Sequence, residues 1–273
     1  MKIGIMSDSL RLPLFESLEK SRELGADGVQ MYAVRGEMAP ENLNDRKVAE
    51  LNRVLQENGL EVSALCGDMG GGFTDPGTNP EKILRSKRII DLALALNTNI
   101  VTTHIGVVPE DMDSDTYKIL QEACNELAEY AGARHAFFAI ETGPEPAERL
   151  KTFLDSLDHK GVAVNLDPAN LVMVSGDDPV KAVEVLAPYI VHTHAKDGIR
   201  IRPIDAEAFY TGKIGVNGCF EEVPLGKGGV GFPAYLAALK DAGYDSYLTI
   251  EREVGLDPAK DISEAVHFLR NLI

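Results

Sequence analysis

Residues 137–170 read FFAIETGPEPAERLKTFLDSLDHKGVAVNLDPAN and contain a complete strand-helix-strand unit. The apolar run FFAIE has the length of a strand, PAERLKTFLDSL has helical periodicity, and VAVNLD is a second strand-length run. A strand, a helix and another strand in this order form the basic unit of a parallel sheet. Both apolar runs end on a carboxylate, Glu141 and Asp167.

The same alternation extends along the whole chain, about eight times with about 34 residues per unit. It predicts a single-domain parallel (β/α)8 TIM barrel of the α/β class over residues 1–273. A doubly wound open sheet would show the same alternation, but a barrel mouth brings several strand ends together more readily. Residues 199–231 are too long for an ordinary connection after the seventh strand. We interpret them as a substrate-covering loop, with a plain insertion as the alternative.

The composition is that of a globular protein, with 44% hydrophobic and 26% charged residues. A formal net charge of −16 with scattered Lys and Arg would repel a polyanion, so nucleic acid is not an expected partner. Cys66, Cys124 and Cys219 have no metal-finger or CxxC spacing and indicate a reducing compartment. The start MKIGIMSD lacks the pattern of a secretion signal, and no apolar stretch approaches about 18 residues. We therefore expect a cytoplasmic protein without a membrane partner.

Four side chains with metal-binding chemistry end strand-length runs: Glu141, Asp167, His194 and Glu251. The first two gaps are nearly equal, 26 residues from 141 to 167 and 27 from 167 to 194, as repeated units would produce. Residues that end strands can point into a barrel mouth, where three carboxylates and one imidazole suit a divalent metal. This donor set suits Mn²⁺, Mg²⁺, Co²⁺ or Zn²⁺, and the lack of Cys argues against structural zinc. For any one residue alone, a capped strand end or a solvated loop carboxylate is the alternative.

Five short motifs occur along the chain in a fixed order. They are ETG (141–143), LDPAN (166–170), HAKDG (194–198), VPLGKGGVGF (223–232) and YLTIERE (247–253). With these motifs essentially the whole chain resembles the sugar phosphate isomerase/epimerase family, within the xylose-isomerase-like barrel superfamily. That superfamily also contains ketose 3-epimerases, inosose dehydratases and endonuclease IV. The resemblance implies one divalent metal ion held by Glu141, Asp167, His194 and Glu251.

The chemistry of this family gives each of the two glutamates a second role. Epimerisation or isomerisation next to a carbonyl removes one proton and returns one, through an enediolate with negative charge on oxygen. A metal chelated by two adjacent substrate oxygens would stabilise that charge as a Lewis acid. In the resembling epimerases the two metal-bound glutamates exchange the protons, which implies catalytic roles for Glu141 and Glu251. The predicted function is therefore a metal-dependent sugar or sugar phosphate isomerase or epimerase.

Three other functions are compatible with the same scaffold. An inosose dehydratase-like lyase would use the same metal and base but expel hydroxide. A non-catalytic sugar-binding barrel could retain the ligand set without turnover. An endonuclease IV-like phosphodiesterase would need more histidines at strand ends, and the net charge of −16 also disfavours it. A small carbohydrate is the expected partner, and a homo-oligomer is compatible with the sequence.

Histidines and a lysine beside the cluster are weaker candidates. His104 could hydrogen-bond a substrate hydroxyl or be a buried structural histidine. Lys196 could contact a substrate oxygen, oriented by Asp197, or simply form a local ion pair. His192 shares a strand face with His194 but lies one layer deeper, so we expect a hydrogen-bonded histidine of the barrel interior.

Further substrate contacts are predicted in the loops. Asp68 and Glu145 could bind sugar hydroxyls or be solvated carboxylates. Asn170 occupies the place of a substrate-binding histidine in the ketose 3-epimerases, which disfavours a free-ketose 3-epimerase. Residues 226–229, GKGG, could present backbone N–H groups and Lys227 to an anion, but they lack the full GxxxxGK[ST] pattern of a phosphate-binding loop.

Overall fold

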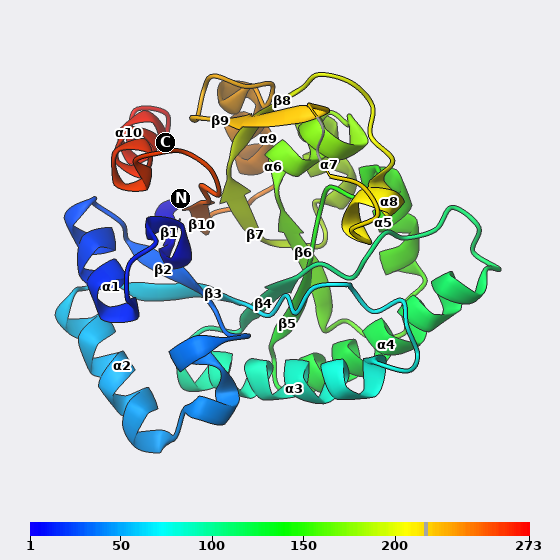
Figure 1. Ribbon diagram of the computed structural model, residues 1–273, viewed down its shortest axis with the longest axis horizontal. Helices are drawn as coiled ribbons and strands as arrows, with labels where there is room; N and C mark the ends of the chain where they lie inside the picture. The colour runs from blue at the N-terminus through cyan, green and yellow to red at the C-terminus, as the bar shows by residue number, and fades with distance from the viewer. Residues whose placement is uncertain (216–217) are drawn as a thin grey trace.

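Eight parallel strands form a closed barrel in the computed structural model, which describes residues 1–215 and 218–273 (Figure 1). The strands are β1 (Lys2–Met6), β2 (Gly28–Tyr32), β3 (Glu61–Cys66), β4 (Ile100–Thr103), β5 (Phe137–Glu141), β6 (Val162–Leu166), β7 (Ile190–Ala195) and β10 (Tyr247–Ile250). Their order around the barrel is β1, β10, β7, β6, β5, β4, β3, β2, and β1 pairs with both β10 and β2. This closure confirms the predicted barrel and excludes an open sheet.

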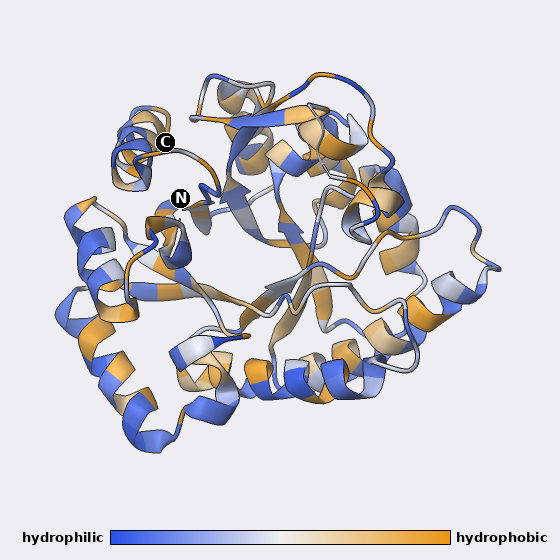
Figure 2. Ribbon diagram, viewed as in Figure 1, coloured by the Kyte–Doolittle hydropathy of each residue, from blue (hydrophilic) through white to orange (hydrophobic). Residues whose placement is uncertain are grey.

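Helices surround the barrel and cover its outer side (Figure 1). The longer ones are α1 (Leu14–Glu23), α2 (Asp45–Glu57), α3 (Asn79–Ala95), α4 (Asp115–Gly132), α5 (Ala147–Asp155), α7 (Pro179–Leu186), α9 (Phe232–Asp241) and α10 (Pro258–Arg270). Short turns of helix are η1 (Ser7–Leu10), η2 (Gly36–Met38), η3 (Pro40–Asn42), α6 (Pro168–Asn170) and η4 (Leu171–Ser175). Figure 2 shows apolar and polar residues alternating around the helices, as expected when one face packs on the barrel.

Local sequence signals account for the boundaries of these elements. All five residues of β6 are buried, which explains why parallel strands read as nearly continuous apolar runs. Helix α2 begins after Asn44, whose side chain accepts the Lys47 N–H at 3.1 Å. It ends at Glu57 and is followed by the C-cap residue Asn58 and by Gly59, whose φ of 62° favours glycine. Asn58 and Gly59 therefore form the stop signal of this helix.

The segment between β7 and α9 contains regular structure. Strands β8 (Asp197–Arg200) and β9 (Phe220–Val223) form an antiparallel pair, and helix α8 (Ala206–Tyr210) lies between them in the chain. This excursion, residues 197–223, extends beyond the carboxyl end of β7 and beside the barrel mouth (Figure 1). It accounts for much of the long segment predicted at 199–231, of which residues 216–217 lie outside the described residues. Its elements are four or five residues long, too short for periodicity to reveal.

Within residues 1–215 and 218–273, no helix is both long enough and apolar enough to cross a membrane.

Candidate metal centre and active site

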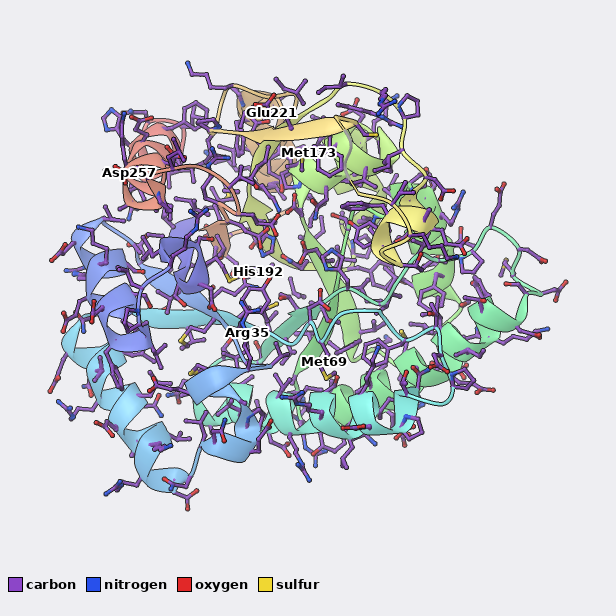
Figure 3. All side chains as sticks on the ribbon, viewed as in Figure 1. Arg35, Met69, Met173, His192, Glu221 and Asp257 are labelled. Atoms are coloured by element: carbon purple, nitrogen blue, oxygen red, sulfur yellow. The ribbon has the colours of Figure 1, made fainter. Side chains whose placement is uncertain are left out.

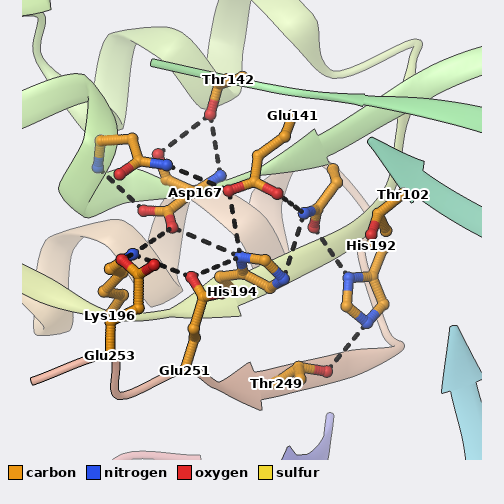
Figure 4. A network of polar contacts seen from close by, with 12 residues as sticks. Thr102, Glu141, Thr142, Asp167, His192, His194, Lys196, Thr249, Glu251 and Glu253 are labelled. Carbon is orange, nitrogen blue, oxygen red and sulfur yellow. Dashed lines mark hydrogen bonds and ion pairs between the residues drawn. The ribbon is translucent and has the colours of Figure 1, made fainter. Parts of the chain in front are cut away.

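The four predicted ligands converge at the carboxyl ends of four consecutive strands of the barrel, β5, β6, β7 and β10 (Figure 4). One potential ligand atom from each residue lies within 4.8 Å of the others. The Nδ1 atom of His194 lies 3.4 Å from Asp167 Oδ2, 3.4 Å from Glu251 Oε2 and 3.6 Å from Glu141 Oε1. All four residues are buried. One nitrogen thus faces three carboxylates from neighbouring strands.

The opposite nitrogen of His194 is fixed by a side chain that sequence reasoning missed. The Oε1 atom of Gln30 on β2 accepts from His194 Nε2 at 3.0 Å, and Gln30 Nε2 donates to Thr102 Oγ1 at 2.8 Å. With a proton on Nε2, the lone pair of Nδ1 faces the three carboxylates and is free to bind a metal ion placed among them. Hydrogen bonds of this kind orient metal-binding histidines in proteins. An amide inside the buried run GVQMY was a signal that could have identified Gln30.

Two asparagines hold the Glu141 carboxylate from both sides. Asn165 Nδ2 donates to Oε2 of Glu141 at 3.2 Å, and Asn170 Nδ2 donates to Oε1 at 3.1 Å. The backbone N–H of Asn170 also donates to Asp167 Oδ1 at 2.9 Å, because Asp167 caps the short helix α6. Asn170, predicted as a substrate contact, therefore touches two members of the cluster. Asn165 was not predicted, although an amide in the buried run VAVNL indicated it.

His192 lies one layer below the cluster, as the strand alternation predicts (Figure 4). It is fully buried, with Nδ1 2.8 Å from Asn165 Oδ1 and Nε2 2.9 Å from Thr249 Oγ1. Burial, followed by the charge of His194, holds the pKa of His192 well below its usual value. A neutral imidazole with both nitrogens hydrogen-bonded is a structural part of the barrel interior.

Three carboxylates around one imidazole require compensating positive charge. Burial opposes protonation of His194, yet Glu251 and Glu141 outweigh it and hold the imidazole pKa well above its usual value. A divalent cation among the same atoms would supply that charge and leave the imidazole neutral. The buried set of one nitrogen and three oxygen donors could therefore hold a metal ion such as Mn²⁺, Mg²⁺, Co²⁺ or Zn²⁺.

Lys196 supplies a cation beside the cluster. Its Nζ lies 3.0 Å from Glu251 Oε2 and 4.0 Å from Asp167 Oδ2, and it also pairs with Glu253 (Figure 4). The side chain is buried. Burial would raise the pKa of Glu251, but Lys196 and then His194 outweigh it, so that pKa is lowered. Lys196 therefore helps to keep Glu251 ionised.

Asp197 binds backbone N–H groups of the GKGG segment, whereas Lys196 pairs with other carboxylates. Its buried carboxylate accepts the backbone N–H groups of Gly198 (2.9 Å), Gly226 (2.9 Å), Gly228 (3.0 Å) and Val230 (3.2 Å). The remaining two N–H groups of residues 226–229 are also used: position 227 donates to the carbonyl of residue 224, and position 229 to that of residue 198. The nest predicted to receive a phosphate is thus occupied by an internal carboxylate, and the Lys227 side chain is exposed.

Replacing Asp197 by Asn should destabilise the protein by about 2–4 kcal/mol, because two of the four N–H groups, which are buried or partly buried, would face an amide donor. Equilibrium unfolding in urea measures the effect. The matched control is Asp205→Asn, at an exposed cap that accepts a single N–H, from Ala208 at 3.0 Å. We expect the control to lose at most about 1 kcal/mol. Equal losses in the two variants would show that the Asp197 nest contributes no special stability.

A histidine-aspartate pair forms another part of the mouth. His104 Nδ1 lies 3.0 Å from Asp68 Oδ2, and its Nε2 lies 3.6 Å from Glu141 Oε1, longer than an ordinary hydrogen bond. Burial opposes protonation of His104, but Glu141 and then Asp68 raise its pKa to about 9. Both residues line the cavity at the barrel mouth, and a substrate contact was predicted for each of them.

A cavity of about 920 Å³ opens at the barrel mouth above the cluster. Glu141 and Glu251 line it, whereas Asp167 and His194 lie behind them. The excursion 197–223 contributes an aromatic wall of Phe209, Tyr210 and Phe220, in which the Tyr210 ring lies 5.4 Å from that of His104. Figure 3 shows Met173 and Glu221, two further lining residues, near β8 and β9. Asn170 and Lys196 also line the cavity.

Glu145 lies outside this group. It is 2% exposed, accepts the Val108 N–H at 3.0 Å and is absent from the described residues that line the cavity. Burial raises the pKa of Glu145 to about 7, although the Val108 N–H works in the opposite direction. Its contact holds the loop after β4, and its predicted role in substrate binding stays a prediction.

The raised pKa of Glu145 gives a pH-dependent prediction. The folded protein keeps a proton on this carboxyl up to about pH 7, whereas the ordinary value is 4.5. The folded state therefore binds more protons between these limits, and this group's contribution to stability falls as pH rises through the window. Glu145→Gln should raise the free energy of unfolding at pH 8 by up to about 3 kcal/mol and give no gain at pH 4. Urea unfolding at pH 4 and pH 8 measures the change, with the exposed residue Glu148 replaced by Gln as the control. An equal effect of Glu145→Gln at the two pH values would contradict the prediction.

Comparison with known proteins identifies the family. Residues 18–272 match the family model described as Xylose isomerase-like TIM barrel. The uncharacterized protein MJ1311 of Methanocaldococcus jannaschii is 24% identical over 277 aligned positions, which cover 95% of this chain and 86% of that protein. The xylose isomerase domain protein of Planctomyces limnophilus is 26% identical, with a TM-score of 0.81 over 99% of this chain and 96% of its own.

Two solved structures at lower identity share the fold. A D-tagatose 3-epimerase-like protein aligns with a TM-score of 0.76 and 20% identity over 100% of this chain and 98% of its own. IolI, solved with a bound zinc atom, aligns with a TM-score of 0.78 and 18% identity over 100% of this chain and 98% of its own. Because the family model covers nearly all of the sequence, the chain belongs to the xylose isomerase-like TIM barrel family.

Proposed function

We propose that this protein is a divalent-metal-dependent sugar isomerase or epimerase that moves a proton next to a carbonyl. The observation that carries the proposal is the position of Glu141 and Glu251, which belong to the four-residue cluster and also line the cavity. Asp167 and His194 are almost completely shielded behind them. The cluster thus combines a buried ligand set with two carboxylates that a substrate can touch. Family membership and the epimerase-like structural neighbour support the same class of reaction.

Glu141 and Glu251 would perform the proton transfer from different sides of the substrate. Their strands, β5 and β10, are separated in the barrel by β6 and β7, so the two carboxylates approach the mouth from different positions. Lys196 keeps Glu251 ionised, the form in which a carboxylate accepts a proton. The hydrogen bonds from Asn165 and Asn170 orient Glu141. A carboxylate held in a fixed orientation is already close to the geometry that proton transfer requires.

The residues that would hold the metal are Glu141, Asp167, His194 and Glu251. Gln30 would set the imidazole tautomer that this requires. When bound, the cation would supply Lewis-acid stabilisation of the negative charge that develops on a substrate oxygen. The bound zinc in the IolI neighbour supports a metal in this fold.

Substrate contacts are proposed for residues around the mouth. Asp68 holds His104 through Nδ1, while Nε2 of His104 has no hydrogen-bond partner within the described chain. That nitrogen is buried beside the Glu141 carboxylate, and a sugar oxygen would bind it by entering between the two side chains. Lys196 and Asn170 also line the cavity and can reach a bound sugar. Lys227 is exposed and is not one of the described residues that line the cavity. Its side chain would have to move toward the cavity to make the proposed substrate contact.

Deuterium exchange tests the proposed reaction. Metal-loaded protein incubated with aldoses and ketoses in D₂O should introduce deuterium at the carbon next to the carbonyl, detected by mass spectrometry and NMR. Retention of the carbon skeleton and of all hydroxyls identifies an isomerase or epimerase, whereas loss of one water identifies the dehydratase alternative. Absence of both products across the panel, with one metal ion bound per chain, would contradict the proposal.

A further inference from the structure

Acidic side chains dominate the wall of the cavity. Among the described residues, six carboxylates line it against three basic side chains. The carboxylates belong to Asp68, Glu141, Glu221, Glu222, Glu251 and Glu253, and the basic groups to His104, Lys196 and Arg252. A divalent cation would offset only two charges of its own three carboxylate ligands, so the wall would keep its acidic character.

Each basic group of the wall already has an acidic partner. Arg252 Nη1 donates to Glu222 Oε1 at 2.6 Å, and its Nε donates to Asp261 Oδ2 at 2.9 Å. His104 is paired with Asp68 through Nδ1 at 3.0 Å. An anionic ligand at Arg252 would have to displace a carboxylate from a short, partly buried contact. The second nitrogen of His104, Nε2, is buried 3.6 Å from the Glu141 carboxylate, which would repel an anion there.

Lys196 is the deepest cation of the wall and is paired in the same way. Its Nζ contacts Glu251 at 3.0 Å and also pairs with Glu253, which is itself solvent-accessible. The backbone N–H groups of GKGG, the other anion-binding feature of the mouth, are used by Asp197 and by two carbonyl groups. A phosphate entering the cavity would therefore lose its hydration and meet carboxylates without an unpaired cation.

The same wall suits hydroxyl groups. Carboxylates such as Glu221 and Glu253 accept hydrogen bonds from sugar O–H groups, which carry no charge to be repelled. Phe209, Tyr210 and Phe220 offer an apolar surface for the C–H faces of a sugar. The volume of about 920 Å³ lies near the upper end of the usual range for ligand sites, so a second sugar ring could also be accommodated.

From these contacts we infer that the substrate is an uncharged polyhydroxy carbonyl compound, a free or glycosidic sugar rather than a sugar phosphate or sugar acid. This inference rests on the proposed function, because it concerns the substrate of the same site. Like charges brought together without compensation cost several kcal/mol, and each 1.4 kcal/mol is a factor of ten. We therefore expect kcat/KM for a free sugar to exceed that for its phosphate by at least about 100-fold.

Matched pairs of free sugars and their terminal phosphates test this on the metal-loaded full chain, with deuterium incorporation as the readout. A preference of at least about 100-fold for the free member supports the inference. Equal or better use of the phosphate would overturn it. A comparison of each aldose with the corresponding sugar acid, by competitive inhibition, extends the test to carboxylates: inhibition by the acid at lower concentration than the aldose would also overturn it.

A pair of variants tests whether charge causes the preference. Glu253→Gln removes one of the carboxylates that form ion pairs with Lys196. Because Lys196 would then be less fully neutralised, the preference for the free sugar over its phosphate should fall by about tenfold. The matched control, Glu148→Gln, removes an exposed carboxylate that lies outside the described residues lining the cavity. An equal effect of the two variants would overturn the electrostatic basis of the inference.

Failure of the substrate class can be separated from failure of the proposed function. If neither member of any pair exchanges deuterium although one metal ion is bound, the proposed function is wrong. The charge preference is then judged by thermal unfolding of the metal-free protein with inorganic phosphate as the probe, because phosphate could otherwise bind to open coordination sites of the metal ion. We expect a change in Tm below about 2 °C, since a cavity without an unpaired cation should not bind the anion. A larger stabilisation would overturn the inference.

Discussion

Asp167→Asn and His194→Ala should each reduce metal affinity by more than about 100-fold, because loss of an outer hydrogen bond to a metal ligand alone costs 10- to 100-fold. Asp167 and His194 contribute little surface to the cavity and lie at the centre of the ligand set, 3.4 Å apart. Asn at position 167 keeps an oxygen that can accept the Asn170 N–H, so the cap of α6 is retained. Elemental analysis after metal loading and desalting measures the metal per chain.

Two further variants make this experiment specific. Gln30→Met removes the acceptor for His194 Nε2 but no ligand, so affinity should fall by about 10- to 100-fold. His192→Asn changes a histidine of the same strand in the layer below and should leave one metal ion per chain. Circular dichroism checks that each variant is folded. Full metal retention by folded His194→Ala, or its loss from folded His192→Asn, would contradict the assignment of the ligands.

The barrel and the four-residue cluster were predictable because both depend on short-range patterns. An apolar run that ends on Glu141 or Asp167 shows the strand, its end and the chemical group within six residues. Barrel closure then brings such ends together, whatever the lengths of the intervening helices. The same reasoning placed His192 in the layer below His194, because strand side chains alternate in direction.

The partners of the surrounding charges were not predictable in the same way. Lys196 and Asp197 are adjacent in sequence, yet Lys196 pairs with Glu251 and Glu253, while Asp197 accepts N–H groups from residues 226, 228 and 230. These contacts join segments about 30 to 57 residues apart and depend on how the excursion folds back over the mouth. A sequence pattern such as GKGG shows that N–H groups could bind an anion, but the carboxylate that binds them is set by tertiary structure.

Glu141→Gln and Glu251→Gln should each reduce interconversion of the substrate by at least about 1,000-fold, since a positioned acid or base contributes about 10²- to 10⁴-fold. Both residues also belong to the ligand set, so kcat must be measured at saturating metal and with the metal content of each variant determined. Gln keeps one oxygen as acceptor for Lys196 at position 251 or for an asparagine amide at position 141. The loss should therefore appear in catalysis while the fold is retained.

The direction of residual deuterium exchange distinguishes proton transfer by two groups from a general loss of the site. If each glutamate serves one face of the substrate carbon, Glu141→Gln should still exchange the proton that Glu251 removes, and Glu251→Gln the proton that Glu141 removes. The two variants would then label opposite epimers while neither interconverts them. Glu221→Gln, a lining carboxylate outside the cluster, should retain interconversion within about tenfold of the unmodified protein. Full interconversion by either metal-loaded cluster variant would show that its glutamate is a ligand without a role in proton transfer.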